Sequence, residues 1–427
     1  MTYAIVTFGC RVNQAESFGL EGDLRASGGE AVGASRADLV IVNTCSVTAA
    51  AEQGARQAIR RIARDNPSAK IVVTGCYATR LPADLCSLPA ITRLVPNRDK
   101  FRLVETVRTE LGMPPGARPS GGDDAGGPAI GPGVLGRTVY LLRVQTGCDE
   151  ACSYCAIPAT RGPSRSRPLS AVVSEADRAA KAGFKELMLT GVHLGAYGRD
   201  LEPPLSLAGL LRALGDHGGD ASYRLSSIEP MDCTPAIVDL VATSGRFAPH
   251  FHLPLQHASD RMLRAMRRPC SLASFRRLAD TIRGRLPDAA IGTDLIVGFP
   301  GEAESDFAQC LDLLEDAPLT SAHVFCYSDR PGTAAAGMTP KVHGETVKTR
   351  AAALRGRARE LARRFQLSQV GRVRRGLTLA DGTLVLTDNY LKVRVPPGVA
   401  RNERVQVRLL GVGDVMTGEV VCSPARP

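Results

Sequence analysis

Three cysteines stand close together in the segment GCDEACSYC, with the spacing C-x-x-x-C-x-x-C. Thiols at this density commonly ligate a metal, and zinc is one candidate because C-x-x-C pairs bind it. A structural zinc site takes four ligands, however, and neither a second cysteine pair nor a nearby His completes this set. Cys148, Cys152 and Cys155 instead match a 4Fe-4S cluster that is held by three thiolates and leaves one iron open. An open iron can bind a small molecule and pass it an electron.

A second set of cysteines is spread over the first part of the chain. Cys10, Cys45 and Cys76 each follow directly on a short β-rich run, namely TYAIVTFG, ADLVIVNT and AKIVVTG. A single free cysteine is often just a buried residue. The carboxyl ends of parallel strands, however, share one edge of a sheet, where ligands usually bind. Three cysteines at the same structural position therefore favour a shared ligand set.

The elements that must position these thiols follow from the alternation of strand and helix patterns. The first hundred residues predict a doubly wound α/β domain, and a later stretch with about six β/α units predicts a complete or partial barrel. A segment rich in Gly and Pro separates the two, and alternating short strands at the end predict a small β-barrel. The expected domains are 1–111, a linker at 112–136, the partial barrel at 137–368 and the small barrel at 369–427.

Composition limits the setting of this chemistry. The chain has 427 residues, of which 44% are hydrophobic, and a mean hydropathy of −0.04, as in soluble globular proteins. Neither a membrane span nor a secretory signal is recognisable, so we expect a cytoplasmic protein without a membrane partner. In a reducing cytosol, the 12 cysteines are better explained as including metal ligands than as a disulfide framework.

The positive charge is concentrated towards the end of the chain. The net charge is +10, and residues 341–375 contain eleven Lys or Arg against two Glu. A solvated helix face is one interpretation of the basic segment TVKTRAAALRGRARELARRFQ. The other is contact with a polyanion, since basic small barrels such as the one predicted after it often bind nucleic acid.

The motifs together resemble a known family. TFGCRVNQAES, NTCSVT and TGCYA come before GCDEACSYCAIPATRG, and LTGVHLGAYG, SSIEP, LPLQHASD, DLIVGFPGE and YSDRPGT come after it. A C-x-x-x-C-x-x-C motif after the first barrel strand resembles the radical S-adenosylmethionine (SAM) superfamily, and the whole set resembles its methylthiotransferases. The resemblance covers nearly the whole chain. It implies that Cys10, Cys45 and Cys76 hold a second 4Fe-4S cluster, and that residues 369–427 form an RNA-binding TRAM domain.

The resemblance also implies a reaction and its cofactors. One SAM molecule would supply the methyl group to a sulfur at the second cluster, and another, cleaved at the first cluster, would activate a substrate C–H bond. An external electron donor and a sulfur source are then required as partners. Residues implied to line the SAM pocket are Glu229, Gln256, Ser259, Gly298 and Gly301. Alternative roles remain open, because Glu229 could cap a helix and the two glycines could simply make a turn.

The substrate implied by TFGCRVNQAES and LTGVHLGAYG is N6-threonylcarbamoyladenosine in tRNA, next to the anticodon. The isopentenyladenosine branch more often opens with a YGCQMN-like segment, which is absent here. His257 and Ala258 in LPLQHASD resemble instead the branch that modifies an aspartate of a ribosomal protein. For His257 itself a packed or hydrogen-bonded role is favoured over a catalytic one, and both interpretations stay open. A competing class is a non-catalytic iron–sulfur or zinc protein that binds RNA, although it does not account for the SAM motifs.

Overall fold

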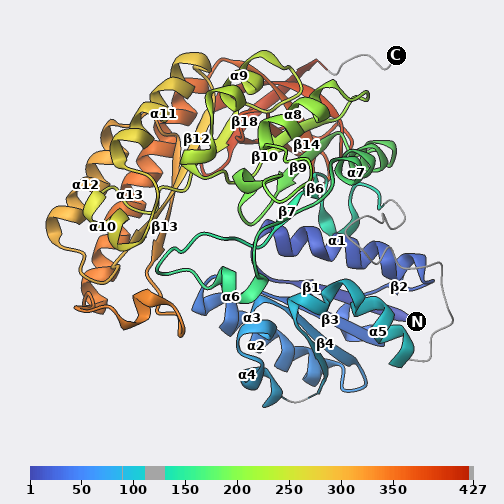
Figure 1. Ribbon diagram of the computed structural model, residues 1–427. Helices are drawn as coiled ribbons and strands as arrows, with labels where there is room; N and C mark the ends of the chain where they lie inside the picture. The colour runs from blue at the N-terminus through green and yellow to red at the C-terminus, as the bar shows by residue number, and fades with distance from the viewer. Residues whose placement is uncertain (89, 111–129, 423–427) are drawn as a thin grey trace.

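The computed structural model describes residues 1–88, 90–110 and 130–422. Most of the predicted linker, residues 112–129, lies outside the described residues, as do residues 423–427 and the side chain of Cys422. Figure 1 shows a parallel sheet with helices on both faces, a partial barrel beside it, and a small barrel behind the partial barrel. The predicted α/β fold class with a small final barrel is thus confirmed.

The amino-terminal sheet is parallel, with strand order β2-β1-β3-β4-β5. Branched aliphatic residues make its central strands almost wholly apolar, as expected for strands that are buried on both faces. One face is covered by α1 and α5, and the other by α2, α3 and α4. The strands are β1 (Thr2–Thr7), β2 (Glu30–Ala31), β3 (Leu39–Thr44), β4 (Lys70–Gly75) and β5 (Ile91–Val95). The helices are α1 (Arg11–Ala26), α2 (Ala49–Asp65), α3 (Cys76–Arg80), α4 (Pro82–Cys86) and α5 (Leu103–Glu110).

The partial barrel consists of two parallel sheets, with strand orders β10-β9-β6 and β11-β12-β13. Two isolated parallel bridges join the sheets. One links Tyr223 to Phe247, and the other links Ser227 to His252. The main strands are β6 (Tyr140–Arg143), β9 (Glu186–Thr190), β10 (Ser222–Leu225), β11 (His250–His252), β12 (Ala290–Val297) and β13 (Ser321–Cys326), and a short pair is formed by β7 (Gln145–Thr146) and β8 (Arg165–Ser166). Its helices are α6 (Ile157–Arg161), α7 (Leu169–Lys181), α8 (Leu207–Asp216), α9 (Pro235–Thr243), α10 (Asp260–Ala265), α11 (Leu272–Arg285) and α12 (Glu304–Asp316).

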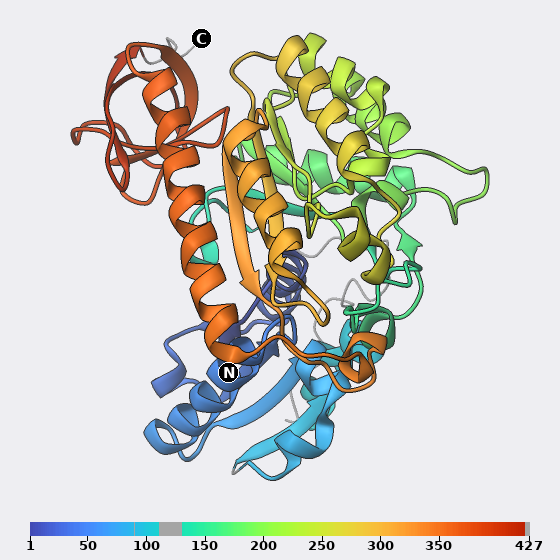
Figure 2. The ribbon, with the colours of Figure 1, turned by 90° about the vertical axis from the view of Figure 1, so that its left-hand side faces the viewer.

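The two edge strands of the partial barrel are both covered by helices from elsewhere in the chain. Helix α1 packs against β6, and its Ala15 and Phe18 belong to the main hydrophobic core. Helix α13 (Gly344–Gln369) runs along β13 and ends at the small barrel (Figure 2). The amino-terminal domain and the partial barrel therefore share a core at the α1–β6 contact. Ile130, near the end of the predicted linker, is buried in this same core.

The small barrel is closed, with strand order β14-β15-β16-β18-β17. It is fastened to the partial barrel by Arg224, which is fully buried and forms a bidentate ion pair with Glu186, at 2.8 and 3.0 Å. The same guanidinium donates to the carbonyl oxygens of Thr387 and Asp388 at 3.1 and 2.8 Å. The strands are β14 (Val373–Leu379), β15 (Leu384–Thr387), β16 (Lys392–Arg394), β17 (Arg404–Gly411) and β18 (Met416–Cys422).

We predict that Gly75→Ala destabilises the amino-terminal domain. Gly75 has φ of +99°, and a Cβ atom there would lie 2.2 Å from the carbonyl oxygen of Thr44. The expected cost is about 2–4 kcal/mol, seen as a lower first transition in calorimetry. Gly218→Ala is the matched control, because a Cβ atom at Gly218 meets nothing within 4 Å. Equal transition temperatures for the two variants would contradict this account.

Candidate active site

The first cysteine triplet lies at the carboxyl edge of the amino-terminal sheet, where the sequence places it. Cys10 precedes α1, Cys45 follows β3, and Cys76 is the first residue of α3 after β4. Two segments of the chain approach each other closely here, because a Cβ atom on Gly9 would lie 2.2 Å from the Sγ of Cys45. Gly9 also has φ of +89°, which favours glycine. The turn that carries Cys10 can thus lie against Cys45 only through a residue that lacks a side chain.

The second triplet lies in the loop between β7 and α6. Cys148, Cys152 and Cys155 are all partly exposed, and none of the described cysteines of the chain forms a disulfide. Gly147, just before the first of them, has φ of +73° and lies against Pro163, so that a Cβ atom would be 1.8 Å from its carbonyl oxygen. The loop is therefore folded back tightly on itself at the point where its first thiol begins.

The surroundings of both triplets suit thiolate ligands. The backbone N–H of Val47 points at the Sγ of Cys45, and that of Ile157 points at the Sγ of Cys155, both at 3.4 Å. Burial raises the pKa of these two thiols to about 11. A metal that binds here must therefore displace protons that are held tightly, as is usual for thiolate ligation. Donors aimed at sulfur and three unpaired thiols per site fit a cluster ligand set in each case.

A cavity of about 240 Å³ joins the two triplets. Its wall includes Cys76 of the first triplet and Cys155 of the second, together with Tyr154, Gln256, Asp294 and Phe325. A larger cavity of about 1130 Å³ lies between α1 and α7, but its described lining includes none of the six cysteines. The smaller cavity is therefore the candidate reaction chamber.

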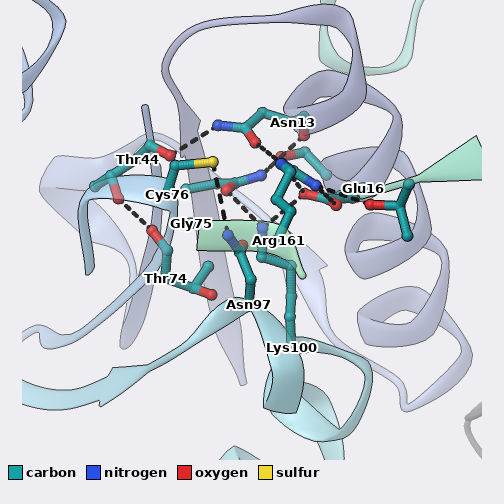
Figure 3. A network of polar contacts seen from close by, with 12 residues as sticks. Asn13, Glu16, Thr44, Thr74, Gly75, Cys76, Asn97, Lys100 and Arg161 are labelled. Carbon is teal, nitrogen blue, oxygen red and sulfur yellow. Dashed lines mark hydrogen bonds and ion pairs between the residues drawn. The ribbon is translucent and has the colours of Figure 1, made fainter. Parts of the chain in front are cut away.

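A buried network of ion pairs joins α1 to α6, the helix that follows the second triplet (Figure 3). Arg161, at the end of α6, donates to Glu16 of α1 at 2.7 Å and to Asn13 at 2.5 Å. Lys100 donates to the second carboxylate oxygen of Glu16 at 2.6 Å. The side chains of Arg161, Lys100 and Glu16 are only 2%, 8% and 13% exposed. Burial alone would raise the pKa of Glu16, but the two cations hold it well below its ordinary value. The ion pair between Arg161 and Glu16 is thus charged, and it joins the amino-terminal domain to the partial barrel.

The network extends to the first triplet. Asn97 donates through Nδ2 to the Sγ of Cys76 at 3.6 Å and to the carbonyl oxygen of Thr160 at 3.0 Å (Figure 3). The guanidinium of Arg161 lies close enough to Cys10 and Cys76 to interact with their charge. Two buried cations against one carboxylate leave a net positive charge beside these thiols. This charge favours an anionic ligand set at the first triplet.

A second ion-pair bridge, centred on Glu52, crosses the same interface. Glu52 of α2 accepts hydrogen bonds at one oxygen from Arg80, at 2.9 Å, and from Arg330, at 3.1 Å. Arg330 belongs to the motif YSDRPGT, which follows β13, and it lies near enough to Cys45 to interact with its charge. Glu16 and Glu52, two carboxylates of the amino-terminal domain, therefore each hold an arginine of the partial barrel, and one of these, Arg330, lines the cavity.

Two of the residues predicted to bind SAM lie near the second triplet or in the cavity. Glu229 forms a close ion pair with Arg268, whose other nitrogen lies 3.7 Å from the Sγ of Cys152. Gln256 lines the cavity and has φ of +81°, which is unusual for a residue with a side chain. This pair stays a predicted part of the cofactor pocket, with Arg268 added to it.

The other three predicted residues have neighbours that give them local roles. Ser259 is buried and donates to Asp306 at 2.6 Å. Gly298 has φ of +79°, and a Cβ atom there would lie 2.4 Å from the side chain of Val347 in α13. Gly301 also has φ of +79° and donates to the carbonyl oxygen of Pro340 at 2.8 Å. None of the three is in the described lining of the cavity.

Sequence reasoning did not single out Arg161, Arg268 or Asp294. Arg161 stands in the quoted segment CAIPATRG, and Asp294 in an otherwise apolar strand, TDLIVGF. A cation shortly after thiolate ligands, and a carboxylate inside an apolar strand, are signals that could have identified these two. Arg268 carries no such signal, because its place beside Cys152 depends on the fold of the loop after α10.

His257 is buried and lies outside the described lining of the cavity. Its ring nitrogens lie 3.6 Å from the Sγ of Cys310 and 3.6 Å from an oxygen of Glu302. Burial alone would lower the pKa of His257, but these two partners raise it to about 9. Glu302 in turn accepts from the backbone N–H of Gly298 at 2.7 Å. His257 thus supports the turn after β12, in agreement with its interpretation as a packed residue.

Comparisons with known proteins agree with this geometry. The profile described as uncharacterized protein family UPF0004 matches residues 2–95, and the radical SAM superfamily profile matches residues 142–314. The threonylcarbamoyladenosine tRNA methylthiotransferase MtaB of Thermotoga maritima is 35% identical over 403 residues, which cover 91% of this chain and 90% of that protein. The ribosomal protein uS12 methylthiotransferase RimO of Saccharopolyspora erythraea is 34% identical, covering 86% and 82%.

A solved structure shows a similar fold. The radical SAM methyltransferase TsrM of Kitasatospora setae, with cobalamin and a 4Fe-4S cluster bound, superposes with a TM-score of 0.55 over 78% of this chain and 77% of that one. The two sequences are 16% identical, so this likeness concerns the fold alone.

A cysteine triplet after the first strand of a partial β/α barrel, together with the superfamily match, defines a radical SAM enzyme. The chain belongs to the radical SAM methylthiotransferase family. Enzymes of this family use SAM and carry two 4Fe-4S clusters, one for each of two cysteine triplets.

We predict that each triplet holds one cluster independently. Anaerobic reconstitution of the unaltered protein should give about eight iron atoms per chain, and Cys76→Ser or Cys155→Ser should each give about four. Iron analysis with electron paramagnetic resonance measures this. Cys86→Ser is the control, because Cys86 is an exposed residue at the end of α4. Full iron content in either triplet variant would contradict the assignment.

We predict a pH effect on stability from His257. Its pKa is raised in the folded protein to about 9. The stabilisation is therefore complete below the ordinary pKa of about 6.5 and is lost as the pH rises through about 9, at up to roughly 1.4 kcal/mol per pH unit. Thermal unfolding from pH 6 to 10, at matched cluster content, should show a smaller loss in His257→Gln than in the unaltered protein. Parallel curves would contradict the pairing.

Proposed function

We propose that this enzyme attaches a methylthio group to N6-threonylcarbamoyladenosine next to the anticodon of tRNA. The observation that carries the proposal is the cavity whose wall contains both Cys76 and Cys155. A base held in this cavity is within reach of both metal centres, as a reaction that joins a radical step to sulfur transfer requires. The relative from Thermotoga maritima, named for this activity, aligns with 91% of the chain and supports the choice of substrate.

The two triplets have separate roles in this proposal. Cys148, Cys152 and Cys155 would hold the cluster that binds SAM, with Glu229, Gln256 and Arg268 around the cofactor. Cys10, Cys45 and Cys76 would hold the second cluster. When bound, these groups supply the radical that activates the substrate C–H bond and the sulfur that is transferred. The protein positions them, and the Arg161–Glu16 pair keeps the two sites at a fixed separation. An external electron donor and a sulfur source complete the reaction.

The basic segment before the small barrel is only partly available to RNA. Arg350 is bound to Glu302 and Glu304, and Arg364 donates to the carbonyl oxygen of Leu314, so both stabilise the packing of α13. Other basic residues of α13 and the small barrel are exposed, among them Arg359, Arg363, Arg375, Lys392 and Arg394. We infer that this second set contacts phosphates, which makes the affinity for tRNA strongly dependent on salt.

The division of the chain follows the same assignment. We propose a cluster-binding domain at 1–111, a linker at 112–136, a radical SAM barrel at 137–368 and a TRAM-like domain at 369–427. Methylthiolation of a ribosomal-protein aspartate is the main alternative, since the RimO relative is 34% identical. The likeness at His257 and Ala258 does not favour it, because His257 packs against Cys310 and Glu302 and lies outside the described lining of the cavity.

We predict that tRNA from a strain without this protein lacks methylthio-threonylcarbamoyladenosine. Mass spectrometry of tRNA nucleosides should show the methylthio group restored by the unaltered gene, and abolished by Cys76→Ser or Cys155→Ser. Unmodified N6-threonylcarbamoyladenosine should accumulate in its place. Cys86→Ser is the control for protein level and should restore the nucleoside.

Two other results would overturn the substrate assignment. Loss of a methylthio group from the ribosomal protein, with tRNA unchanged, would identify the RimO activity. Loss of methylthio-isopentenyladenosine would identify the third branch of the family. Either result leaves the radical SAM chemistry in place and changes the molecule on which it acts.

A further inference from the structure

Three polar residues form a cluster on neighbouring strands of the partial barrel. The ligand atoms of His252 in β11, Asp294 in β12 and His323 in β13 all lie within 4.8 Å of one another. One oxygen of Asp294 lies 3.1 Å from Nε2 of His252 and 3.1 Å from Nδ1 of His323. The interactions of Asp294 with the two imidazoles lower its pKa to about 2 against the opposing effect of burial. The cluster therefore contains a carboxylate that is charged near neutral pH and lies between two rings.

One member of the cluster, Asp294, lines the reaction cavity. Asp294 and Ile296 line it from alternate positions of β12, and Phe325 lines it from β13. His323 is two residues before Phe325, on the same face of the strand, and their rings lie 6.4 Å apart. The side chain of His323 is 63% exposed. His252 and His323 are outside the described lining, so the polar cluster adjoins the cavity through Asp294.

Some of its hydrogen-bonding capacity is not used within the described chain. Nδ1 of His252 lies 2.9 Å from the hydroxyl of Ser227, which fixes the ring. Nε2 of the same ring is buried and makes no well-aligned hydrogen bond among the described residues, although it lies near Asp294. Buried nitrogens of this kind usually have a partner. A ligand that enters the cavity can supply it.

A guanidinium adds positive charge on the side of His323. Arg11, the residue after Cys10, lies close enough to interact with the charge of His323. Its guanidinium donates to the hydroxyl of Tyr390, in the small barrel, at 2.6 Å. The hydrogen bond from His323 to Asp294 raises the pKa of His323 above its ordinary value. The region is therefore rich in donors and positive charge, and also offers one carboxylate acceptor.

We propose that His252, Asp294 and His323 form the subsite for the N6 substituent of the substrate adenosine, with His323 and Arg11 facing its carboxylate. This inference rests on the proposed function and names how the substrate is selected. A threonylcarbamoyl group has two urea N–H donors, a carbonyl, a hydroxyl and a carboxylate. Asp294 can accept from the N–H groups, and the imidazoles and Arg11 can donate to the oxygens. An isopentenyl group would leave these charged partners desolvated against hydrocarbon.

The test is a binding cycle on cluster-loaded protein without reductant, so that no turnover occurs. Synthetic anticodon stem-loop RNAs would carry N6-threonylcarbamoyladenosine, its analogue with the carboxylate converted to a carboxamide, or isopentenyladenosine. Anaerobic fluorescence anisotropy gives Kd for the unaltered protein and for His323→Gln, His252→Gln and Arg11→Gln. His217→Gln is the matched control, because His217 also pairs with an aspartate, Asp177, at 2.8 Å, and Asp177, unlike Asp294, does not line the cavity.

We expect the unaltered protein to bind the carboxylate RNA roughly tenfold more tightly than the carboxamide RNA, as for a charge-assisted hydrogen bond. His323→Gln should lose most of this difference and bind the carboxamide RNA as the unaltered protein does. If changing His323 and changing the carboxylate weaken binding equally, and the second change adds nothing to the first, the two groups interact directly. His217→Gln should keep the full difference, and iron content should match in all variants.

The inference is overturned if His323→Gln keeps the tenfold difference. It is also overturned if a chelator removes the preference and Mn²⁺ restores it, because the cluster would then be a metal site. A second measurement tests the proposed function separately. Reductant and SAM are added, and methylthiolation of the same RNAs is measured. If the unaltered protein methylthiolates the threonylcarbamoyl RNA but the cycle fails, the subsite alone is wrong. If it methylthiolates only the isopentenyl RNA, the proposed function is wrong.

Discussion

The ion pair between Arg161 and Glu16 is the contact on which the arrangement of this enzyme depends. One partner is at the end of α6, the helix after the loop that carries the second cysteine triplet, and the other is in the helix that begins directly after Cys10. Removal of one partner from a buried pair commonly costs about 3–5 kcal/mol, because an uncompensated charge remains. The amino-terminal domain and the partial barrel are therefore held firmly in one relative position. Under the proposed function, this ion pair helps to hold the two cysteine triplets at a fixed separation.

The polar groups beside the thiols and those along the barrel strands next to the cavity are of two kinds. Near the thiols they are donors and cations, such as Asn97 and Arg268, whose effect is to favour negative charge on sulfur. Along β11, β12 and β13 they are imidazoles and a carboxylate, which can both donate and accept. The first kind suits the chemistry common to the family. The second kind is where enzymes with the same chemistry can differ in the molecules they accept.

Much of this architecture could be predicted from the sequence, because it follows from local patterns. The strand runs before Cys10, Cys45 and Cys76 place these residues at one sheet edge by geometry alone. The contacts of Arg161 and Arg330 could not be predicted, because their partners are more than a hundred residues away along the chain. Ser259 and Gly298 show the opposite difficulty. Their types suit a ligand pocket, but the structure surrounds them with Asp306 and Val347.

The buried Arg224 has a consequence for how a large RNA is held. Its guanidinium joins a strand of the partial barrel to carbonyl oxygens of the small barrel, and Tyr390 of the same turn reaches Arg11 of the amino-terminal domain. The three domains are thus clamped at one corner. Under the proposed function, the basic surface that binds the RNA backbone and the cavity that receives one base are held at a fixed distance from each other. The enzyme would then select a nucleotide by the distance between that nucleotide and the bound phosphates, as well as by the chemistry of the base.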